Sequence, residues 1–317
     1  MRQRSSWLVC GIILVCMVGR AEEVTLNPVA DTCLFEFLPD YNFGAQDDLP
    51  AGGLGEGPME GERLARALFK FDVAAAVPAG ATIIAAEMRL RVTRRPGASQ
   101  DPTPSDFALN RVLVDWGEGT KTGEIPGGLA ATAGEATWFH RFYHPDDPES
   151  GRWASPGGQF GVDYASAHSA VKDNVDRTGA YVFSCNATGI AAVQSMLDDP
   201  ARNYGWVLHS LSEHLRTTAR RWASREASAT LRPRLEITWS LPVAPPEITS
   251  VELGASGDTF LVRVRGLAGL SYLLQTSTDL VDWVPGEVQE PSADGEIEFH
   301  APLDGSGFVR VIATPVP

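Results

Sequence analysis

The stretch EMRLRV, residues 87–92, alternates between polar and apolar side chains without a break. Because successive side chains of a β-strand point to opposite faces, its apolar residues share one face: Met88, Leu90 and Val92. Its charged residues share the other face: Glu87, Arg89 and Arg91. The stretch therefore predicts a strand that packs one face on a hydrophobic core and turns two arginines to water.

The rest of the chain continues this pattern in short segments. Its 31 glycines and 22 prolines are scattered, and they divide short apolar runs from one another, which is typical of a β-sandwich or barrel. The expected strands are residues 31–37, 66–73, 82–92, 107–114, 136–143, 180–186, 205–211, 217–222 and 234–240. In the second of these, one buried face is expected from Ala67, Phe69, Phe71 and Val73.

One segment predicts a helix. Thr188 can cap its start, Ile190, Val193 and Leu197 recur at helical spacing, and Pro200 ends it. A single short helix does not make an α/β protein, so we expect an all-β fold.

A proline-rich stretch, PVAPP at residues 242–246, predicts a stiff linker between two domains. Residues 22–241 precede it. Residues 247–317 follow it with period-two runs such as TFLVRV and EIEFH, which suit a small immunoglobulin-like or fibronectin-like β-sandwich.

The first 21 residues have the three parts of a secretion signal. Arg2 and Arg4 form a positive start, residues 7–18 are apolar, and Gly19-Arg20-Ala21 is a small-x-small cleavage site. The apolar run is shorter than the roughly 20 residues that a membrane-spanning helix needs. We therefore expect cleavage after Ala21, a secreted, extracellular protein and no membrane insertion.

The charge of the chain is strongly acidic. Its formal net charge is −14, from 26 basic and 40 acidic residues, and removal of the three arginines of residues 1–21 gives 23 − 40 = −17. Such a balance argues against nucleic acid and anionic membrane surfaces as partners.

Two cysteines remain after cleavage, Cys33 and Cys185. Outside the cell a pair of cysteines can form a disulfide. Both lie in apolar, strand-like surroundings, so two buried free thiols are the alternative.

A series of short motifs follows in order along the first domain. They are ADT at 30–32, YNFG at 41–44, ALFKFD at 67–72, PAGATI at 78–83, DWGEGT at 115–120, ATW at 136–138, PGG at 156–158, NAT at 186–188, NYGWVL at 203–208, SREA at 224–227 and RPRLEITW at 232–239. In this order they resemble the DNRLRE, or disaggregatase-related, domain, which is also carbohydrate-binding module family 96. The resemblance covers about residues 24–241.

This resemblance implies a jelly-roll β-sandwich of secreted bacterial and archaeal proteins. Such domains often accompany polysaccharide-degrading enzymes or cell-surface assemblies, and some bind alginate-like acidic glycans. Most of the motifs are structural, so they bear on the fold more than on the function. The run LSYLLQTSTDLVDW, residues 270–283, is similar to a small module of secreted bacterial proteins.

Glycan binding needs aromatic faces for sugar rings and planar polar groups for hydroxyls and carboxylates. Arg89 and Arg91 are one candidate pair, and the run HLRTTARRWASRE, residues 214–226, supplies a second group: Arg220, Trp222 and Arg225. Surface salt bridges with nearby acids such as Glu87 and Glu226 are the alternative.

The segment TWFHRFYHPDDPESGRW, residues 137–153, is a third candidate and contributes Trp138, Arg141 and Trp153. His140 and His144 do not suit one zinc ion, because residues four apart in a strand lie about 13 Å from each other. Ordinary packing is the alternative reading of this segment.

Calcium is the expected metal, if any, since Asp31 and Asn42 lie close in sequence and offer oxygen ligands. No spacing fixes such a site, and turn-forming Asx residues are the alternative. No catalytic motif is found, and Asp115 and Glu118 occur in a glycine-rich turn.

The expected function is a secreted, non-catalytic carbohydrate-binding or cell-surface interaction protein, with acidic polysaccharides as its ligand class. A structural or adhesive extracellular protein that binds other proteins or matrix is the first alternative. A polysaccharide lyase or glycoside hydrolase is the less favoured one, because two suitably spaced carboxylates would be needed.

Overall fold

The computed structural model describes residues 21–54, 63–97, 102–124, 127–241, 246–254, 259–267, 269–291, 295–302 and 308–315. It divides into two compact units, one of Glu22–Trp239 and one that contains Ser240–Pro317. Four of the five residues of the expected linker, 242–245, lie outside the described residues, as do the first 20 residues of the expected export signal. Each unit is described by itself.

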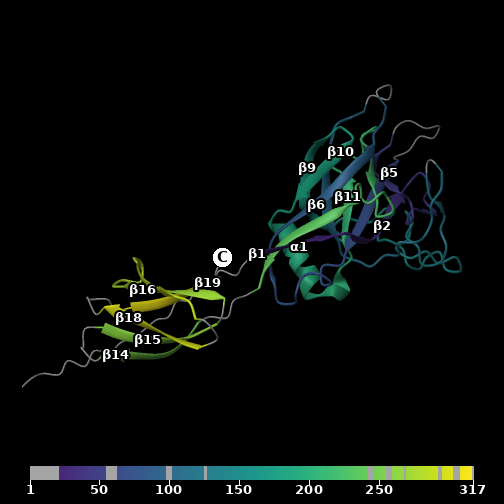
Figure 1. The fold of residues 1–317 in the computed structure, drawn as a ribbon. Helices are drawn as coiled ribbons and strands as arrows, with labels where there is room; N and C mark the ends of the chain where they lie inside the picture. The colour runs from purple at the N-terminus through teal and green to yellow at the C-terminus, as the bar shows by residue number, and fades with distance from the viewer. Residues whose placement is uncertain are drawn as a thin grey trace, which may run out of the picture. The chain divides into compact units, whose positions relative to one another are not determined.

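Strands make up nearly all of the regular secondary structure of the larger unit (Figure 1). They are β1 (Ala21–Leu26), β2 (Pro28–Phe35), β3 (Tyr41–Asn42), β4 (Asp48–Gly53), β5 (Leu64–Phe71), β6 (Thr82–Arg94), β7 (Ser105–Val112), β8 (Leu129–Ala130), β9 (Tyr164–Val175), β10 (Gly179–Ser184), β11 (Trp206–Ser210), β12 (Arg220–Ala223) and β13 (Arg234–Ser240). Eleven strands form a curled sheet in the order β1-β13-β6-β12-β4-β5-β11-β7-β9, with β10 added to β6 and β2 added to β5. The predicted all-β sandwich is confirmed.

The sheet curls into two layers, which β4 joins. The first part of β4 pairs with β12, and its last two residues pair with β5. Gly52 lies at this corner with φ of +112°, and a Cβ there would come 2.8 Å from the Cα atom of Ala219. Only glycine fits so close an approach with that backbone conformation.

The main core lies between the two layers. The inner face of β6 has the predicted alternation: Met88, Leu90 and Val92 are each 1% exposed, whereas Arg89 and Arg91 are exposed. Aromatic residues from the facing strands fill the space between the layers: Phe69, Phe71, Phe107, Phe183, Trp206 and Trp222. The strand that EMRLRV predicts is therefore confirmed, with its charged face exposed to solvent.

A second core covers the outer face of the β5 layer. Residues 113–163 are here called the cap. In its described part the only strand is the short β8, and several of its aromatic side chains pack on this face. The cap contributes Trp116, Trp138 and Trp153, and the strands below contribute Leu34, Leu68 and Val207. We call β2, β5, β11 and β7 the covered layer, because apolar side chains pack on both of its faces. The strands β13, β6, β10 and β12 form the open layer.

The expected strand at 136–143 is not formed. This part of the cap makes turns and an isolated bridge between His140 and Arg152. Its backbone instead bonds to distant loops, for example from Trp138 N to Pro39 O at 3.1 Å. The aromatic pattern that predicts a strand here includes residues that instead attach the cap to the covered layer.

The helix α1 (Ala187–Asp198) occurs where the sequence predicts it. Asn186, rather than Thr188, caps its start, since the Asn186 side chain accepts a hydrogen bond from Gly189 N at 3.0 Å. Val193 and Met196 are buried and join the main core. Among the described residues, no helix is long and apolar enough to cross a membrane.

Of the two alternatives for the cysteine pair, the structure has the two free thiols and no disulfide between Cys33 and Cys185. Cys33 belongs to β2 in the covered layer, and its Sγ lies 3.2 Å from Pro50 O. Cys185 follows β10 in the open layer, beneath Gly189 of α1. Burial raises the pKa of the Cys33 thiol, and raises that of Cys185 to about 12, so both are inert thiols at neutral pH.

The smaller unit is a two-sheet β-structure. One sheet has the order β14-β15-β18, and the other has the order β17-β16-β19. The strands are β14 (Glu247–Leu253), β15 (Thr259–Gly266), β16 (Leu270–Ser277), β17 (Val284–Gln289), β18 (Gly295–Pro302) and β19 (Phe308–Pro315). Its core is formed by alternating residues of both sheets, among them Val262, Tyr272, Leu274 and Phe299.

Candidate functional site

The arginines of EMRLRV lie on the wet face of the open layer. Arg89 is held by Glu236 of β13 at 2.7 Å and by Glu87 at 3.4 Å, so surrounding acids neutralise its charge. It also lines a cavity of about 390 Å³ between β1, β6 and β13. Arg91 is exposed and forms no ion pair with any residue that the structure describes. Of this pair, Arg91 is the guanidinium available to a ligand.

Arg220 and Trp222 do not belong to a binding surface. Trp222 is fully buried and packs edge-on against Phe107 at a centroid distance of 5.1 Å. Arg220 is 1% exposed, and its guanidinium donates to backbone carbonyl oxygens, including Val175 O at 3.0 Å and Thr103 O at 2.8 Å. The prediction that these two side chains contact a glycan is therefore wrong, because both point inward from β12.

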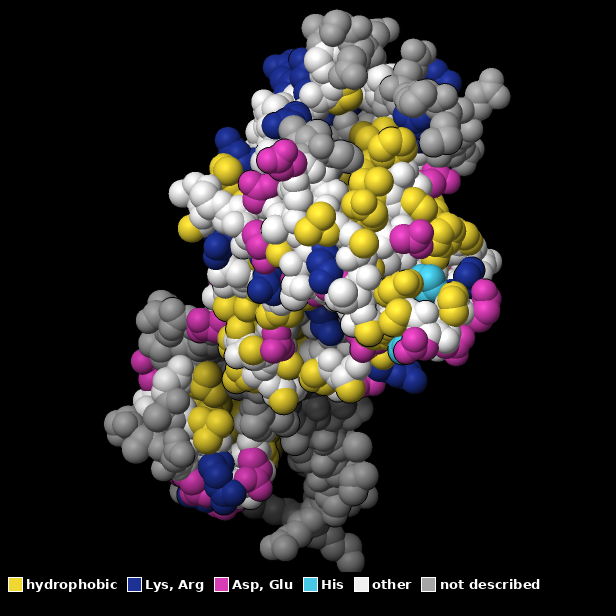
Figure 2. Space-filling model, turned by 90° about the vertical axis from the view of Figure 1, so that its right-hand side faces the viewer, with side chains coloured by type: hydrophobic (Ala, Val, Ile, Leu, Met, Phe, Trp, Pro, Cys, Tyr) yellow, Lys and Arg dark blue, Asp and Glu magenta, His cyan; other side chains and the backbone are white. Residues whose placement is uncertain are grey.

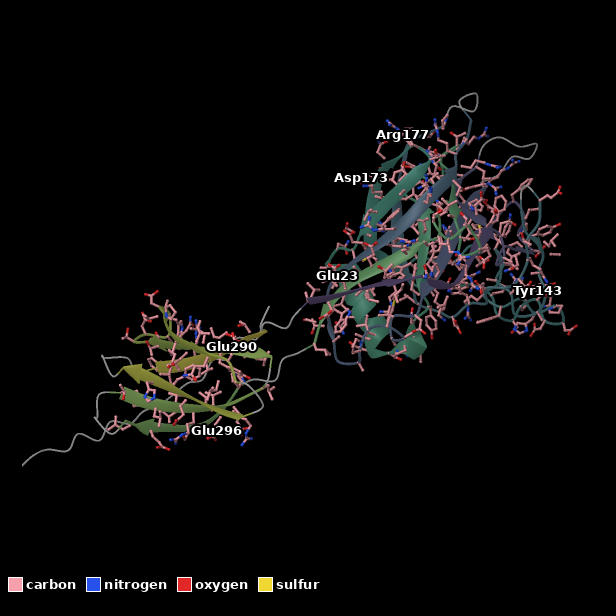
Figure 3. The ribbon with its side chains drawn as sticks, viewed as in Figure 1. Glu23, Tyr143, Asp173, Arg177, Glu290 and Glu296 are labelled. Atoms are coloured by element: carbon pink, nitrogen blue, oxygen red, sulfur yellow. The ribbon has the colours of Figure 1, made fainter. Side chains whose placement is uncertain are left out.

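The cap residues are structural in the same way. Trp138 and Trp153 are each 4% exposed, and Trp153 Nε1 donates to Thr137 O at 3.0 Å. Arg141 donates to the carbonyls of Asp115 and Arg152, at 3.1 and 3.2 Å. The predicted stacking surface of Trp138 and Trp153 is wrong, because both rings are packed on the covered layer. Tyr143 of the cap lies far from Asp173 of β9 and from Arg177, which follows β9 (Figure 3).

Asn42 holds two loops together. Its amide nitrogen donates to Glu118 O at 2.7 Å and to Ala136 O at 3.0 Å, while its Oδ1 accepts from Gly44 N at 3.0 Å and Lys121 N at 3.2 Å. All of its hydrogen-bonding capacity is used, so Asn42 has no oxygen to offer to a calcium ion. The part of the calcium prediction that rests on Asn42 is wrong.

The same contacts bring Glu118 beside Asp31, where four motif residues from three distant segments meet. Asp31 N donates to Glu118 Oε1 at 2.9 Å, and Arg225 N donates to Asp31 Oδ2 at 2.7 Å. The Arg225 guanidinium bridges Glu118 at 3.1 Å and Glu226 at 3.0 Å, and it also donates to Val29 O. We call Asp31, Glu118, Arg225 and Glu226 the acidic cluster.

Two carboxylate oxygens of this cluster are buried without a partner among the described residues: Asp31 Oδ1 and Glu226 Oε2. Asp31 itself is fully buried. Burial raises the pKa of Asp31 well above its usual range, against the hydrogen bond from Arg225 N, and the charges of Glu226 and Glu118 raise it further. Burial also raises the pKa of Glu118.

A cavity of about 590 Å³ opens beside the cluster, lined by Asn27, Pro28, Val29, Arg225, Glu226 and Arg232. This volume is in the range of small-ligand sites. Arg232 is exposed, and its Nε donates to Ala227 O at 2.8 Å. Two guanidinium groups and one carboxylate therefore line one cavity.

Of the residues predicted to bind a ligand, only Arg225 lies at this cavity. Glu118, Glu226 and Arg232 were not among them, although each belongs to a motif of the sequence: DWGEGT, SREA and RPRLEITW. Their meeting depends on tertiary contacts across 87 to 194 residues, which no local pattern reveals. Basic and acidic side chains are interspersed on the face that Figure 2 presents.

Comparison with models of known protein families gives no match, and no curated protein matches the chain. Among solved structures, a β-1,2-glucanase from Parabacteroides distasonis is matched with 9% identity and a TM-score of 0.14. The match covers 94% of this chain and 37% of the glucanase, so the chain spans little more than a third of that protein. A likeness this weak bears on neither fold nor function.

Proposed function

We propose that this protein is a secreted, non-catalytic carbohydrate-binding protein that holds an acidic polysaccharide at the cavity of Arg225 and Arg232. The observation that carries the proposal is that two guanidinium groups line one cavity of about 590 Å³. Planar guanidinium groups bind carboxylate and sulfate through paired hydrogen bonds. The order of motifs that resembles the DNRLRE domain supports the same ligand class.

The two arginines differ in how they are held. Arg225 is fixed by Glu118, Glu226 and Val29 O, so little conformational entropy is lost when it meets a ligand. Among the described contacts, Arg232 is held only by the hydrogen bond that its Nε donates. Arg225 thus fixes the orientation of the ligand, and Arg232 adds an adaptable contact to an anionic sugar.

The test is retention of the mature protein, residues 22–317, in gels that contain one polysaccharide each. Alginate, pectate and a sulfated glycan are compared with neutral glucan and mannan. We expect retention at micromolar protein on at least one acidic polysaccharide, weakening as salt rises. Retention on none of the acidic polysaccharides would overturn the proposal.

Variants then locate the contact. Arg232→Ala should weaken retention roughly tenfold, which corresponds to about 1.4 kcal/mol. Arg177→Ala is the matched control, because the Arg177 side chain is 82% exposed at another part of the unit (Figure 3). Equal losses in both variants would show only a general charge effect and would exclude this cavity as the site.

A hydrolase or lyase is the second candidate, because Asp31 and Glu118 have raised pKa values beside an arginine and a cavity. Perturbed carboxyl groups of this kind serve as general acids in glycosidases. Incubation of the protein with alginate, pectate and β-glucans would reveal new reducing or unsaturated ends. Their formation by the wild type, and its loss in Glu118→Gln, would replace the binding proposal by a catalytic one.

A further inference from the structure

The acidic cluster has an excess of two negative charges. It contains the carboxylates of Asp31, Glu118 and Glu226 and only one guanidinium, that of Arg225. Arg225 is shared between Glu118 and Glu226 and reaches Asp31 only through its backbone N–H. Buried charges that lack a counter-charge are strongly destabilising, so the cluster needs added positive charge, from a bound cation or from a proton on a carboxyl group.

The unpartnered oxygens show where this charge belongs. Asp31 is 0% exposed and its Oδ1 accepts no hydrogen bond from the described residues. Glu226 Oε2 is also buried and without a partner in the described part of the chain, although the whole side chain is 26% exposed. A buried carboxylate oxygen normally accepts one or more hydrogen bonds. Two that accept none, in one cluster, are candidate ligands for a bound cation.

The chemistry of the donors favours calcium over a transition metal. The cluster offers carboxylate oxygens, without sulfur or imidazole, which suits hard cations. Within the described residues, no three His, Cys, Asp or Glu side chains form a group that could hold a metal. This result holds for Asp31, Glu118 and Glu226 as well, so a site here can use only two carboxylates, and calcium can take the rest of its six to eight ligands from carbonyl groups and water.

We propose that Asp31 and Glu226 bind one calcium ion beneath the arginine-lined cavity, with Glu118 as a further negative charge beside it. The ion neutralises the excess charge of the cluster and links β2 to the segment after β12. This proposal does not depend on glycan binding. A calcium ion at this position would join the first motif of the domain, ADT, to one of its last, SREA.

The test measures stability with calcium alone. The mature protein is treated with a chelator, desalted, and its Tm is measured with increasing CaCl₂. At a hundredfold excess over the dissociation constant we expect Tm to rise by roughly 5 to 10 °C. Titration calorimetry should give one site per chain, with magnesium binding more weakly because it demands a stricter octahedral geometry.

Three variants locate the ion. Glu226→Gln and Asp31→Asn preserve side-chain shape and should abolish the calcium-dependent shift in Tm. Glu149→Gln is the control, because its carboxylate is 83% exposed in the cap. If Asp31→Asn does not fold, Glu226→Gln still decides, since that side chain is partly exposed.

Two outcomes would overturn the proposal. The first is an unchanged Tm of the wild type in millimolar calcium. The second is the same shift in Glu226→Gln as in the wild type, which would place calcium elsewhere. Because no glycan is present, either result leaves the polysaccharide proposal to its own test.

Discussion

The covered layer and the open layer of the larger unit differ in how many of their faces meet water. In the covered layer, β5 and β11 are buried on both faces, by the main core on one side and by the cap on the other. In the open layer, β6 buries one face and exposes Arg89 and Arg91 on the other. Whether an aromatic or basic residue can contact a ligand therefore depends on the layer and the face of the sheet to which it belongs.

Arg220 and Arg221 show this difference between neighbours on one strand. Arg220 points inward and donates to backbone carbonyls, whereas Arg221 points outward and pairs with Asp48 at 2.6 Å. A basic cluster in the sequence therefore contains side chains with opposite roles, because successive residues of a strand alternate in direction.

The largest effect on stability is expected in the cap, and it tests the difference between the covered and the open layer. Trp153→Ala removes a buried ring from between the cap and the covered layer, so it should lower the free energy of unfolding by about 3 to 5 kcal/mol. Urea unfolding, followed by far-UV circular dichroism, measures the change. A loss of less than about 1 kcal/mol would mean that the cap is a loosely attached loop, and the distinction between the layers would fail.

The second largest effect on stability is expected at the buried guanidinium of Arg220. Arg220→Met keeps the length of the side chain but leaves several carbonyl groups without their donor, so we expect a loss of about 3 kcal/mol. Arg221→Met, on the same strand, should cost about 1 kcal/mol or less, because its ion pair with Asp48 is nearer to solvent. Equal costs in the two variants, measured by the same unfolding assay, would contradict the assignment of inward and outward roles.

Much of the fold could be predicted from local patterns. The alternation in EMRLRV predicts β6 and its inner face, and the helical spacing of Ile190 and Val193 predicts α1. The sequence also predicts a buried face of β5 at Ala67 and Phe69. It does not show that Leu68, on the opposite face, is buried too. That burial comes from the cap, whose residues begin 45 positions later.

One expected strand is absent, and several strands, among them β9, were not predicted. Residues 136–143 have the aromatic content of a strand, but Trp138 and Phe139 pack on the covered layer from a loop. β9 has few large apolar residues, so its pattern is weak, and it forms because β7 offers a partner edge along most of its length. In both cases tertiary contacts outweigh the local β-propensity of the sequence.

The candidate site could be predicted only in part. Asp31 and Arg225 were singled out, for a metal and for a glycan respectively, and the structure brings them into contact through one hydrogen bond. Glu118 resembled a turn residue, and Glu226 a surface partner for arginine. Their convergence depends on how Asn42 and the glycine-rich loop dock, and Gly119 approaches Asn42 so closely that a Cβ would lie 2.2 Å from its Oδ1.

A third effect, smaller than the first two, depends on pH. His209 of β11 faces the cap, 4.7 Å from the Phe160 ring, and burial together with the charges of Arg66 and His168 lowers its pKa to about 3. The unfolded chain binds a proton at this residue near pH 6.5, whereas the folded protein does not until about pH 3. This contribution to stability is therefore complete above pH 6.5 and is lost as the pH falls toward 3.

His209→Gln should remove this contribution. Between pH 6.5 and 5.5 the wild type should lose about 1 kcal/mol more stability than the variant. His214→Gln is the control, because His214 is exposed. Parallel pH profiles of the wild type and His209→Gln, from urea midpoints, would show that His209 titrates normally and that the cap leaves it open to water.

The smallest effect on stability is expected at Arg91. Its side chain is exposed on the open layer and has no ion pair with a described residue, so Arg91→Ala should change the free energy of unfolding by less than about 0.5 kcal/mol. Arg89→Ala breaks contacts with Glu236 and Glu87, which are exposed to solvent, so its effect on stability should also be small. If the wet face of β6 contributes to binding of an acidic polysaccharide, Arg91→Ala reduces retention and its salt dependence while the protein stays folded. Retention equal to that of the wild type would restrict binding to the cavity of Arg225 and Arg232, because Arg91 is the basic side chain of the EMRLRV pair that surrounding acids do not neutralise.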